Sequence, residues 1–140
     1  MTVVAYDGSV MAADTQALWS GDNVKTDDCK KIFKSRGHTF GIAGEAPPGN
    51  KQLIEWFFGD KKRIPRAEFT LLVIRPDGKA EEWDQDGRCE PIAKSFWAIG
   101  AAAEAALVGM GLGHSARETV AECIKHCGSV GGKVFWKKVQ

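Results

Sequence analysis

The second residue of the chain, Thr2, could do chemistry once the initiator methionine is removed. Methionine aminopeptidase removes Met1 when the next residue is small, so we expect a mature protein that begins at Thr2. A free α-amino group then stands beside a hydroxyl on one residue. Because an N-terminal amine titrates at about pH 7.7 to 8.0, it can take the proton of a hydroxyl that is otherwise a poor nucleophile. Many chains begin Met-Thr without such a role, so the dipeptide needs support from other residues.

The other reactive side chains are four cysteines, Cys29, Cys89, Cys123 and Cys127. Cys123 and Cys127 are at positions i and i+4 with His126 between them, a spacing that a zinc site can use. Two further ligands would have to come from Cys89, Cys29 or His114, whose positions follow no zinc-binding pattern. The cysteine density is below that of a disulfide scaffold, so we expect reduced thiols in the cytosol that act as small buried hydrophobic groups.

The composition indicates a single globular domain over residues 1–140. With 140 residues, 44% of them hydrophobic, the chain can form a core. Lys and Arg number 19 against 18 Asp and Glu, and the net charge of +1 favours neither nucleic acid nor an anionic membrane as a partner. No apolar run approaches the roughly 20 residues of a membrane span. Asp7 and Asp14 interrupt any leader-like segment, so we expect a cytoplasmic protein without a secretory leader.

Two short apolar runs, TVVAY and SVMAAD, flank an Asp7-Gly8 turn signal and predict a β-hairpin that carries Thr2 and Asp14. Two registers are open. A strict two-residue loop would place Thr2 opposite Ala13 and turn Asp14 to the other face. A bulge with Gly8 in the left-handed conformation would shift the pairing by one and place Thr2 opposite Asp14.

Further strands and helices are expected along the chain. SGDNVKTDDC should cross the surface, KKIFK and HTFGIAG should pair around SRG, and EFTLLVIRPDGKAEEW should form two strands around a Pro-Asp-Gly turn. NKQLIEWFFGD predicts a well-buried helix that Gly59 ends. The last third predicts a strand in KSFWAIG, a small-residue helix in AAAEAALVGMGLG, a helix with a capping box from Ser115 to Glu118, and a strand in GGKVFWKKV. The grouping of strands and helices favours an α+β fold with antiparallel sheets covered by helices.

Several of these segments together resemble one family. TVVAYDGSVMAADTQA, followed by CKKIF, GIAGEA and WAIGAAAEAAL, is similar to the proteasome-type N-terminal nucleophile hydrolases, which comprise proteasome β subunits and the HslV-type bacterial peptidase. The similarity spans nearly the whole chain, keeps the order of the elements and is closest to short bacterial and phage versions without a propeptide. It implies an αββα sandwich, in which two antiparallel sheets are stacked between helical layers.

The resemblance also implies site residues. It assigns Thr2 as the nucleophile whose α-amine acts as base, Asp14 in AADTQA and Lys31 in CKKIF as its partners, and the backbone N–H of Glu45 as the oxyanion donor. A lysine ammonium near Thr2 would lower the pKa of both the hydroxyl and the α-amine. A backbone donor tolerates any side chain, so a glutamate is compatible with that role. Taken singly, Asp14 also fits a turn or a cap, Lys31 a surface lysine, and Thr2 an ordinary strand start.

The chain departs from the family pattern around the α-amine. Ala101 and Ala103 stand in AIGAAAE where family members usually carry serine. An aspartate and a serine expected before the last strand are also missing, although Ser129 takes such a position if the Gly131-Gly132 anchor shifts by one residue. Loss of supporting groups around a reactive group typically lowers the rate by orders of magnitude.

Two functions follow as expectations. The first is threonine-type hydrolysis of a peptide or a small amide by Thr2 through an acyl-ester, with neither a metal nor an organic cofactor. The alternative is a catalytically degenerate proteasome-like protein that acts in assembly or partner binding. By resemblance alone, a homo-oligomeric ring and an ATPase partner are expected, whereas nucleic acid and membranes are not expected partners.

Overall fold

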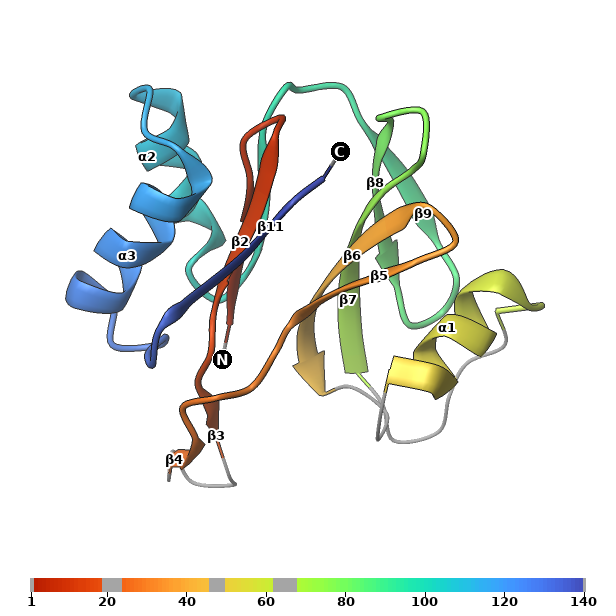
Figure 1. The fold of residues 1–140 in the computed structure, drawn as a ribbon, viewed down its shortest axis with the longest axis horizontal. Helices are drawn as coiled ribbons and strands as arrows, with labels where there is room; N and C mark the ends of the chain where they lie inside the picture. Colours follow the sequence, from red (N-terminus) through yellow and green to blue (C-terminus); the bar gives the residue numbers. More distant parts are fainter. Residues whose placement is uncertain (1, 19–23, 46–49, 62–67, 140) are drawn as a thin grey trace.

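Four layers make up the fold, in the order helices, sheet, sheet, helix (Figure 1). The computed structural model describes residues 2–18, 24–45, 50–61 and 68–139. Helices α2 (Ala103–Gly111) and α3 (Ala116–His126) lie on one side of the sheets, and α1 (Asn50–Phe58) lies on the other. The expected αββα sandwich is therefore confirmed.

Antiparallel pairing joins the strands within each sheet. The four-stranded sheet has the order β10 (Trp97–Gly100), β1 (Val3–Tyr6), β2 (Val10–Asp14) and β11 (Val134–Lys138). The five-stranded sheet has the order β5 (Ile32–Ser35), β6 (His38–Glu45), β7 (Glu68–Ile74), β8 (Ala80–Asp84) and β9 (Cys89–Ile92). A small separate sheet pairs β3 (Ala17–Leu18) with β4 (Val24–Thr26).

Most predicted elements are confirmed, but three short strands were missed. The segment SGDNVKTDDC, expected only to cross the surface, contains β4, which pairs with β3; residues 20–23 of that segment lie outside the described residues. Strand β9 was missed because its four residues include Glu90 and Pro91. A charge and a proline are poor strand signals, yet both suit an edge strand, which is the place of β9 in its sheet.

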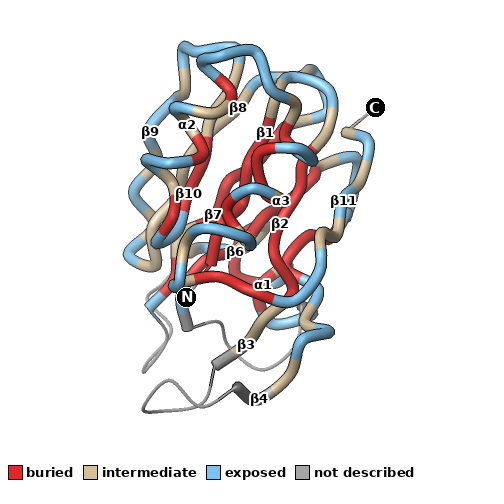
Figure 2. Tube along the Cα trace, turned by 90° about the vertical axis from the view of Figure 1, so that its left-hand side faces the viewer, coloured by how far each residue is buried: buried red, intermediate tan, exposed pale blue. Residues whose placement is uncertain are grey.

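Three apolar clusters fill the spaces between the layers, because each strand turns successive side chains to opposite faces. Val3 packs with α2 and α3. Its neighbour Val4 faces the other sheet and belongs to one cluster with Leu72. Phe40 of β6 packs with Phe57 of α1 on the outer face of the five-stranded sheet. Figure 2 shows the buried positions concentrated along the strands.

The β1–β2 hairpin has neither of the two registers considered for it. Val4 lies opposite Ala13. Continued by one position, this pairing places Asp14 opposite Val3, so both expected partners of Thr2 were wrong. Thr2 and Asp14 are diagonal neighbours at the open end of the hairpin rather than a direct cross-strand pair.

The turn accounts for this register. Its tip is formed by Gly8 and Ser9, and Gly8 has a φ of 100°, which suits the first central position of a type II′ turn. The Asp7 carboxylate accepts hydrogen bonds from the N–H groups of Ser9 and Val10 at 2.9 Å each, and from the N–H of Ala116 in α3 at 2.9 Å. Burial alone would raise the pKa of Asp7, but these backbone N–H groups outweigh it and lower the pKa below its ordinary value.

In the helix pair that covers β1 and β2, a capping box begins α3 and a glycine in α2 allows close packing of the two helices. Ser115 Oγ accepts the N–H of Glu118, and the Glu118 carboxylate accepts the N–H of Ser115, which confirms the predicted capping box. Gly109 brings α2 close to α3, because a Cβ there would lie 3.1 Å from the side chain of Thr119. Within the described ranges, no helix has the length and apolar character that a bilayer crossing requires.

Gly41 in β6 lets the two large sheets approach each other. A Cβ at this position would lie 2.5 Å from Cγ1 of Val4 and 2.9 Å from Sδ of Met11, and both of those side chains are fully buried. Gly41 pairs with Ile32, the residue that follows Lys31. The spacing of the sheets at this point therefore also sets the distance that Lys31 must span.

We predict that Gly41→Ala lowers the free energy of unfolding by about 1 to 3 kcal/mol, which is the usual effect of overpacking a dense core. Gly128→Ala is the matched control, since a Cβ at Gly128 meets nothing within 4 Å. Urea unfolding followed by circular dichroism measures both variants. Equal stabilities would contradict the close approach of the sheets.

Candidate active site

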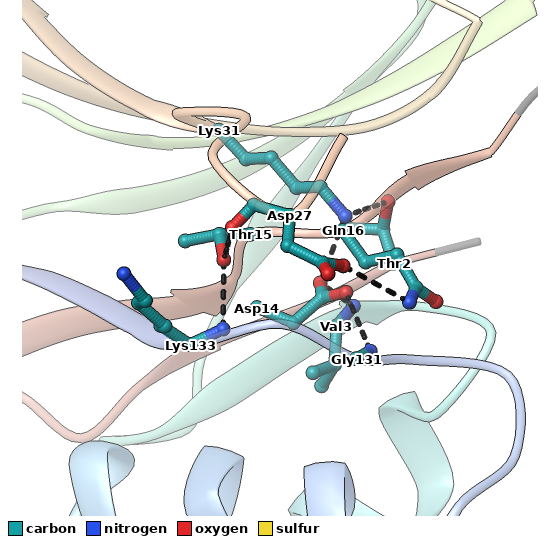
Figure 3. Close-up of polar contacts among 9 residues, drawn as sticks. All are labelled: Thr2, Val3, Asp14, Thr15, Gln16, Asp27, Lys31, Gly131 and Lys133. Atoms are coloured by element: carbon teal, nitrogen blue, oxygen red, sulfur yellow. Dashed lines mark hydrogen bonds and ion pairs between the residues drawn. The ribbon is translucent and has the colours of Figure 1, made fainter. Parts of the chain in front are cut away.

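Thr2, Asp14 and Lys31 meet at one end of the space between the two large sheets. Lys31 Nζ donates to Thr2 Oγ1 at 3.0 Å and to Asp14 Oδ1 at 2.9 Å (Figure 3). All three residues are buried, at 6%, 0% and 5% exposure for Thr2, Asp14 and Lys31. The structure thus brings together the three side chains that the resemblance selected.

Each of the three residues is placed by the end of a strand. Thr2 directly precedes β1, Asp14 is the last residue of β2, and Lys31 directly precedes β5 in the other sheet. The carbonyl of Lys31 accepts the N–H of Ile42 at 2.9 Å, which holds its backbone on β6. From there its side chain crosses between the sheets, whereas the neighbouring Lys30 is exposed.

The Asp14 carboxylate accepts hydrogen bonds from three donors. Besides Lys31, its Oδ1 accepts the N–H of Val3 at 3.1 Å, and its Oδ2 accepts the N–H of Gly131 at 3.2 Å. A buried carboxylate needs such partners, because an unpaired charge in the interior is strongly unfavourable. Asp14 therefore joins the start of β1, the start of β5 and the loop that follows α3.

The loop after α3 approaches β2 closely because it contains Gly131 and Gly132. A Cβ at Gly131 would lie 2.6 Å from Nε2 of Gln16, and one at Gly132, whose φ is 80°, would lie 2.5 Å from Oγ1 of Thr15. The N–H of Lys133 donates to Thr15 Oγ1 at 2.7 Å. These contacts fix the Gly131 N–H against Asp14.

The loop brings its backbone, rather than Ser129, to the site. Ser129 is half-buried in the turn before Val130. Among the described residues, no hydrogen bond joins its side chain to Thr2, Asp14 or Lys31. The part expected for Ser129 at the site stays a prediction.

The segment after β10 contacts the backbone of Thr2. The N–H of Ala102 points at the Thr2 carbonyl oxygen at 3.5 Å, and a Cβ at Gly100 would clash with that same oxygen. Ala101 lines the cavity beside Thr2, whereas Ala103 packs against the cluster under α2 and α3. Of these two alanines, Ala101 is therefore the one that borders Thr2.

A cavity of about 510 Å³ opens beside Thr2. Gly44, at the end of β6, forms part of its wall. Glu45 follows directly and lies opposite Glu68 of β7 in the strand register. Gly44 at this strand end and Thr2 therefore line the same cavity, and the part expected for the Glu45 N–H as oxyanion donor stays a prediction.

The cysteine pair lies apart from this site. Cys123 is buried in the cluster under the helices, and Cys127 packs against that cluster. Burial, followed by the nearby Cys127, raises the pKa of the Cys123 thiol to about 11. In the part of the chain that the structure describes, no three His, Cys, Asp or Glu side chains are grouped to hold a metal ion.

Sequence reasoning missed the two backbone donors on Asp14. The N–H groups of Val3 and Gly131 carry no side-chain signal. The Gly131-Gly132 pair was the one available clue, because adjacent glycines before a strand allow a close backbone approach.

Comparisons with known proteins show the fold. No family model and no curated protein matches the chain. Among solved structures, HslV from Trypanosoma brucei is similar with a TM-score of 0.72 at 15% identity, covering 99% of this chain and 98% of that one. Thiobacillus denitrificans BPH in complex with epoxomicin has a TM-score of 0.69 at 17% identity, with both chains covered completely. A second structure of Thiobacillus denitrificans BPH has a TM-score of 0.66 at 19% identity, covering 100% of this chain and 99% of that one.

We predict that Asp14 and Lys31 are strongly coupled in stability. Asp14→Asn and Lys31→Met should each lower the free energy of unfolding by about 3 to 5 kcal/mol, because each leaves an uncompensated buried charge. The double variant should lose clearly less than the sum. Asp77 and Lys79, an exposed pair at 4.0 Å, supply the control cycle, for which we expect a coupling of about 0.5 kcal/mol or less. Additive losses at Asp14 and Lys31 in urea unfolding would contradict the pairing.

Proposed function

We propose that the chain is a threonine-type N-terminal nucleophile hydrolase that cleaves a peptide or another amide. The carrying observation is the buried contact of Lys31 Nζ with both Thr2 Oγ1 and Asp14 Oδ1, at 3.0 and 2.9 Å, beside an open cavity. A surface lysine or a capping aspartate would need no such arrangement. The shared fold of HslV and BPH agrees with this proposal.

In the proposed mechanism, removal of Met1 frees the α-amine of Thr2. The amine takes the proton of the Thr2 hydroxyl while Oγ1 attacks the amide carbonyl carbon, and the protonated amine then gives that proton to the departing amine. An acyl-ester on Oγ1 remains. A water molecule attacks the ester with the α-amine again acting as base, which releases the acid and restores Thr2.

Lys31 and Asp14 have separate parts in this mechanism. The ammonium of Lys31 stabilises negative charge that develops on Oγ1 as the proton leaves. Asp14 holds Lys31 in place and keeps the buried positive charge compensated. The backbone N–H of Glu45 remains our proposed donor to the oxyanion, and the neighbouring Gly44 in the cavity wall supports that choice.

A second function is favoured by one specific observation. Ala101 borders Thr2 where a serine hydroxyl would help to orient the α-amine, and Ser129 makes no hydrogen bond with the three central residues. If the amine is poorly held, the fold serves as a non-catalytic assembly or partner-binding protein. Formation of an acyl-enzyme at Thr2 rules this alternative out.

We also propose that the protein is cytoplasmic and forms a homo-oligomer. The four cysteines are unpaired thiols, which suits a reducing compartment. Val108 of α2 and Leu112, which caps the C-terminal end of that helix, are exposed at 64% and 75%. Large exposed apolar side chains close together favour a contact with another subunit. Light scattering should give a mass above one chain, and a monomer at micromolar concentration would count against assembly. An ATPase partner rests on the resemblance alone.

We predict that Thr2→Ala lowers kcat/KM for fluorogenic peptide amides by at least about 1000-fold, because the nucleophile is lost. Thr2→Ser is the matched control, since it keeps a hydroxyl and the α-amine and should retain measurable hydrolysis. Activity is measured on purified chains whose N-terminal residue has been verified by mass. Undiminished hydrolysis by Thr2→Ala would show that another group is the nucleophile.

A further inference from the structure

The cavity beside Thr2 is lined by residues from several strand ends. Besides Thr2, Gly44 and Ala101, its wall includes Glu68 and Thr70 of β7 and Gln85 in the turn after β8. At about 510 Å³, its volume lies within the range of small-molecule and side-chain binding pockets. The small residues at Gly44 and Ala101 leave the space next to Thr2 open.

The described residues that line this cavity carry a net negative charge. Among the described residues that line it, Glu68 alone carries a formal charge. Glu68 is exposed, and within the described ranges it forms no ion pair. Lys31 does not neutralise the cavity, because its ammonium is bound to Asp14.

The remaining polar groups of the wall suit a cationic side chain. The Thr70 hydroxyl and the Gln85 side-chain carbonyl can both accept hydrogen bonds from N–H groups. The methyl groups of Ala43 and Ala101 supply apolar surface along which a methylene stem can lie. Lysine and arginine combine an apolar stem with a charged group that carries several N–H donors.

We propose that the substrates are peptides with a lysine or arginine next to the amide that Thr2 attacks, and that this side chain enters the cavity and pairs with Glu68. The proposal rests on the proposed hydrolase function. It identifies Glu68 as the residue that sets specificity, with Thr70 and Gln85 as additional acceptors. A complementary charge in a cleft also favours encounter with a cationic substrate.

The test separates binding from turnover. Three peptides that differ only at one central residue, lysine, acetyl-lysine or glutamate, are titrated by fluorescence anisotropy into the Thr2→Ala chain, which cannot hydrolyse them. The lysine peptide should bind about fivefold more tightly than its neutral acetylated form, which is the upper end for an exposed ion pair. High salt should reduce that ratio, because it screens the charge.

The preference should depend on Glu68 in particular. In the same chain, Glu68→Gln should abolish the lysine preference, and Glu68→Lys should make the glutamate peptide the tighter ligand. Glu90→Gln, at an exposed glutamate on the edge strand β9, is the matched control and should retain the preference. Circular dichroism verifies that each variant is folded.

The outcomes distinguish this proposal from the proposed function. Equal affinities for the lysine and acetyl-lysine peptides, or no measurable binding of the lysine peptide, overturn the specificity proposal even if the wild-type chain cleaves amides. A lysine preference that Glu68→Gln removes supports it, even if the wild-type chain cleaves no amide and the hydrolase proposal fails.

Discussion

The interaction on which this structure depends most is the buried pair of Lys31 and Asp14. Two charges leave water in the interior only if their attraction and their hydrogen bonds offset the loss of hydration. Asp14 achieves this with three donors, Lys31 Nζ and the N–H groups of Val3 and Gly131. Because these donors come from different segments, the pair specifies how β1, β5 and the loop after α3 meet. The hydroxyl of Thr2 lies where they converge.

Three glycines shape the surroundings of Thr2 and Asp14. Gly100 leaves room for the Thr2 carbonyl, Gly131 presents its N–H to Asp14, and Gly44 forms a wall of the cavity. Where the resembling family carries serine hydroxyls, this chain has Ala101 beside Thr2. Among the described contacts of the Thr2 hydroxyl, the hydrogen bond from Lys31 Nζ at 3.0 Å brings a positive charge to it. Ala101 has no hydroxyl, so its side chain offers no hydrogen bond to the α-amine of Thr2.

Local signals predicted many of the secondary-structure elements, and a family resemblance selected the central residues of the site. The capping box at Ser115, the turn between β5 and β6 and the helix that ends before Gly59 all follow from short-range chemistry. Thr2, Asp14 and Lys31 were predicted together from the resemblance of their segments to one family, since each residue taken singly also fits an ordinary structural role. The register of the first hairpin was not predictable, since it depends on the Asp7 carboxylate holding a turn at Gly8-Ser9 and on a contact with α3, which is distant in sequence. The cavity wall was missed for the same reason, because Glu68, Thr70 and Gln85 meet Thr2 only in the folded chain.

The central claim is that Thr2 becomes the N-terminal residue and is an activated nucleophile. The most direct test is the intact mass of the purified protein before and after incubation with a threonine-directed β-lactone. The account predicts a chain that lacks Met1 and gains one inhibitor equivalent, which peptide mapping locates on Thr2. A chain that retains Met1, whose α-nitrogen at Thr2 is then an amide, or a processed chain that stays unlabelled, would contradict the claim.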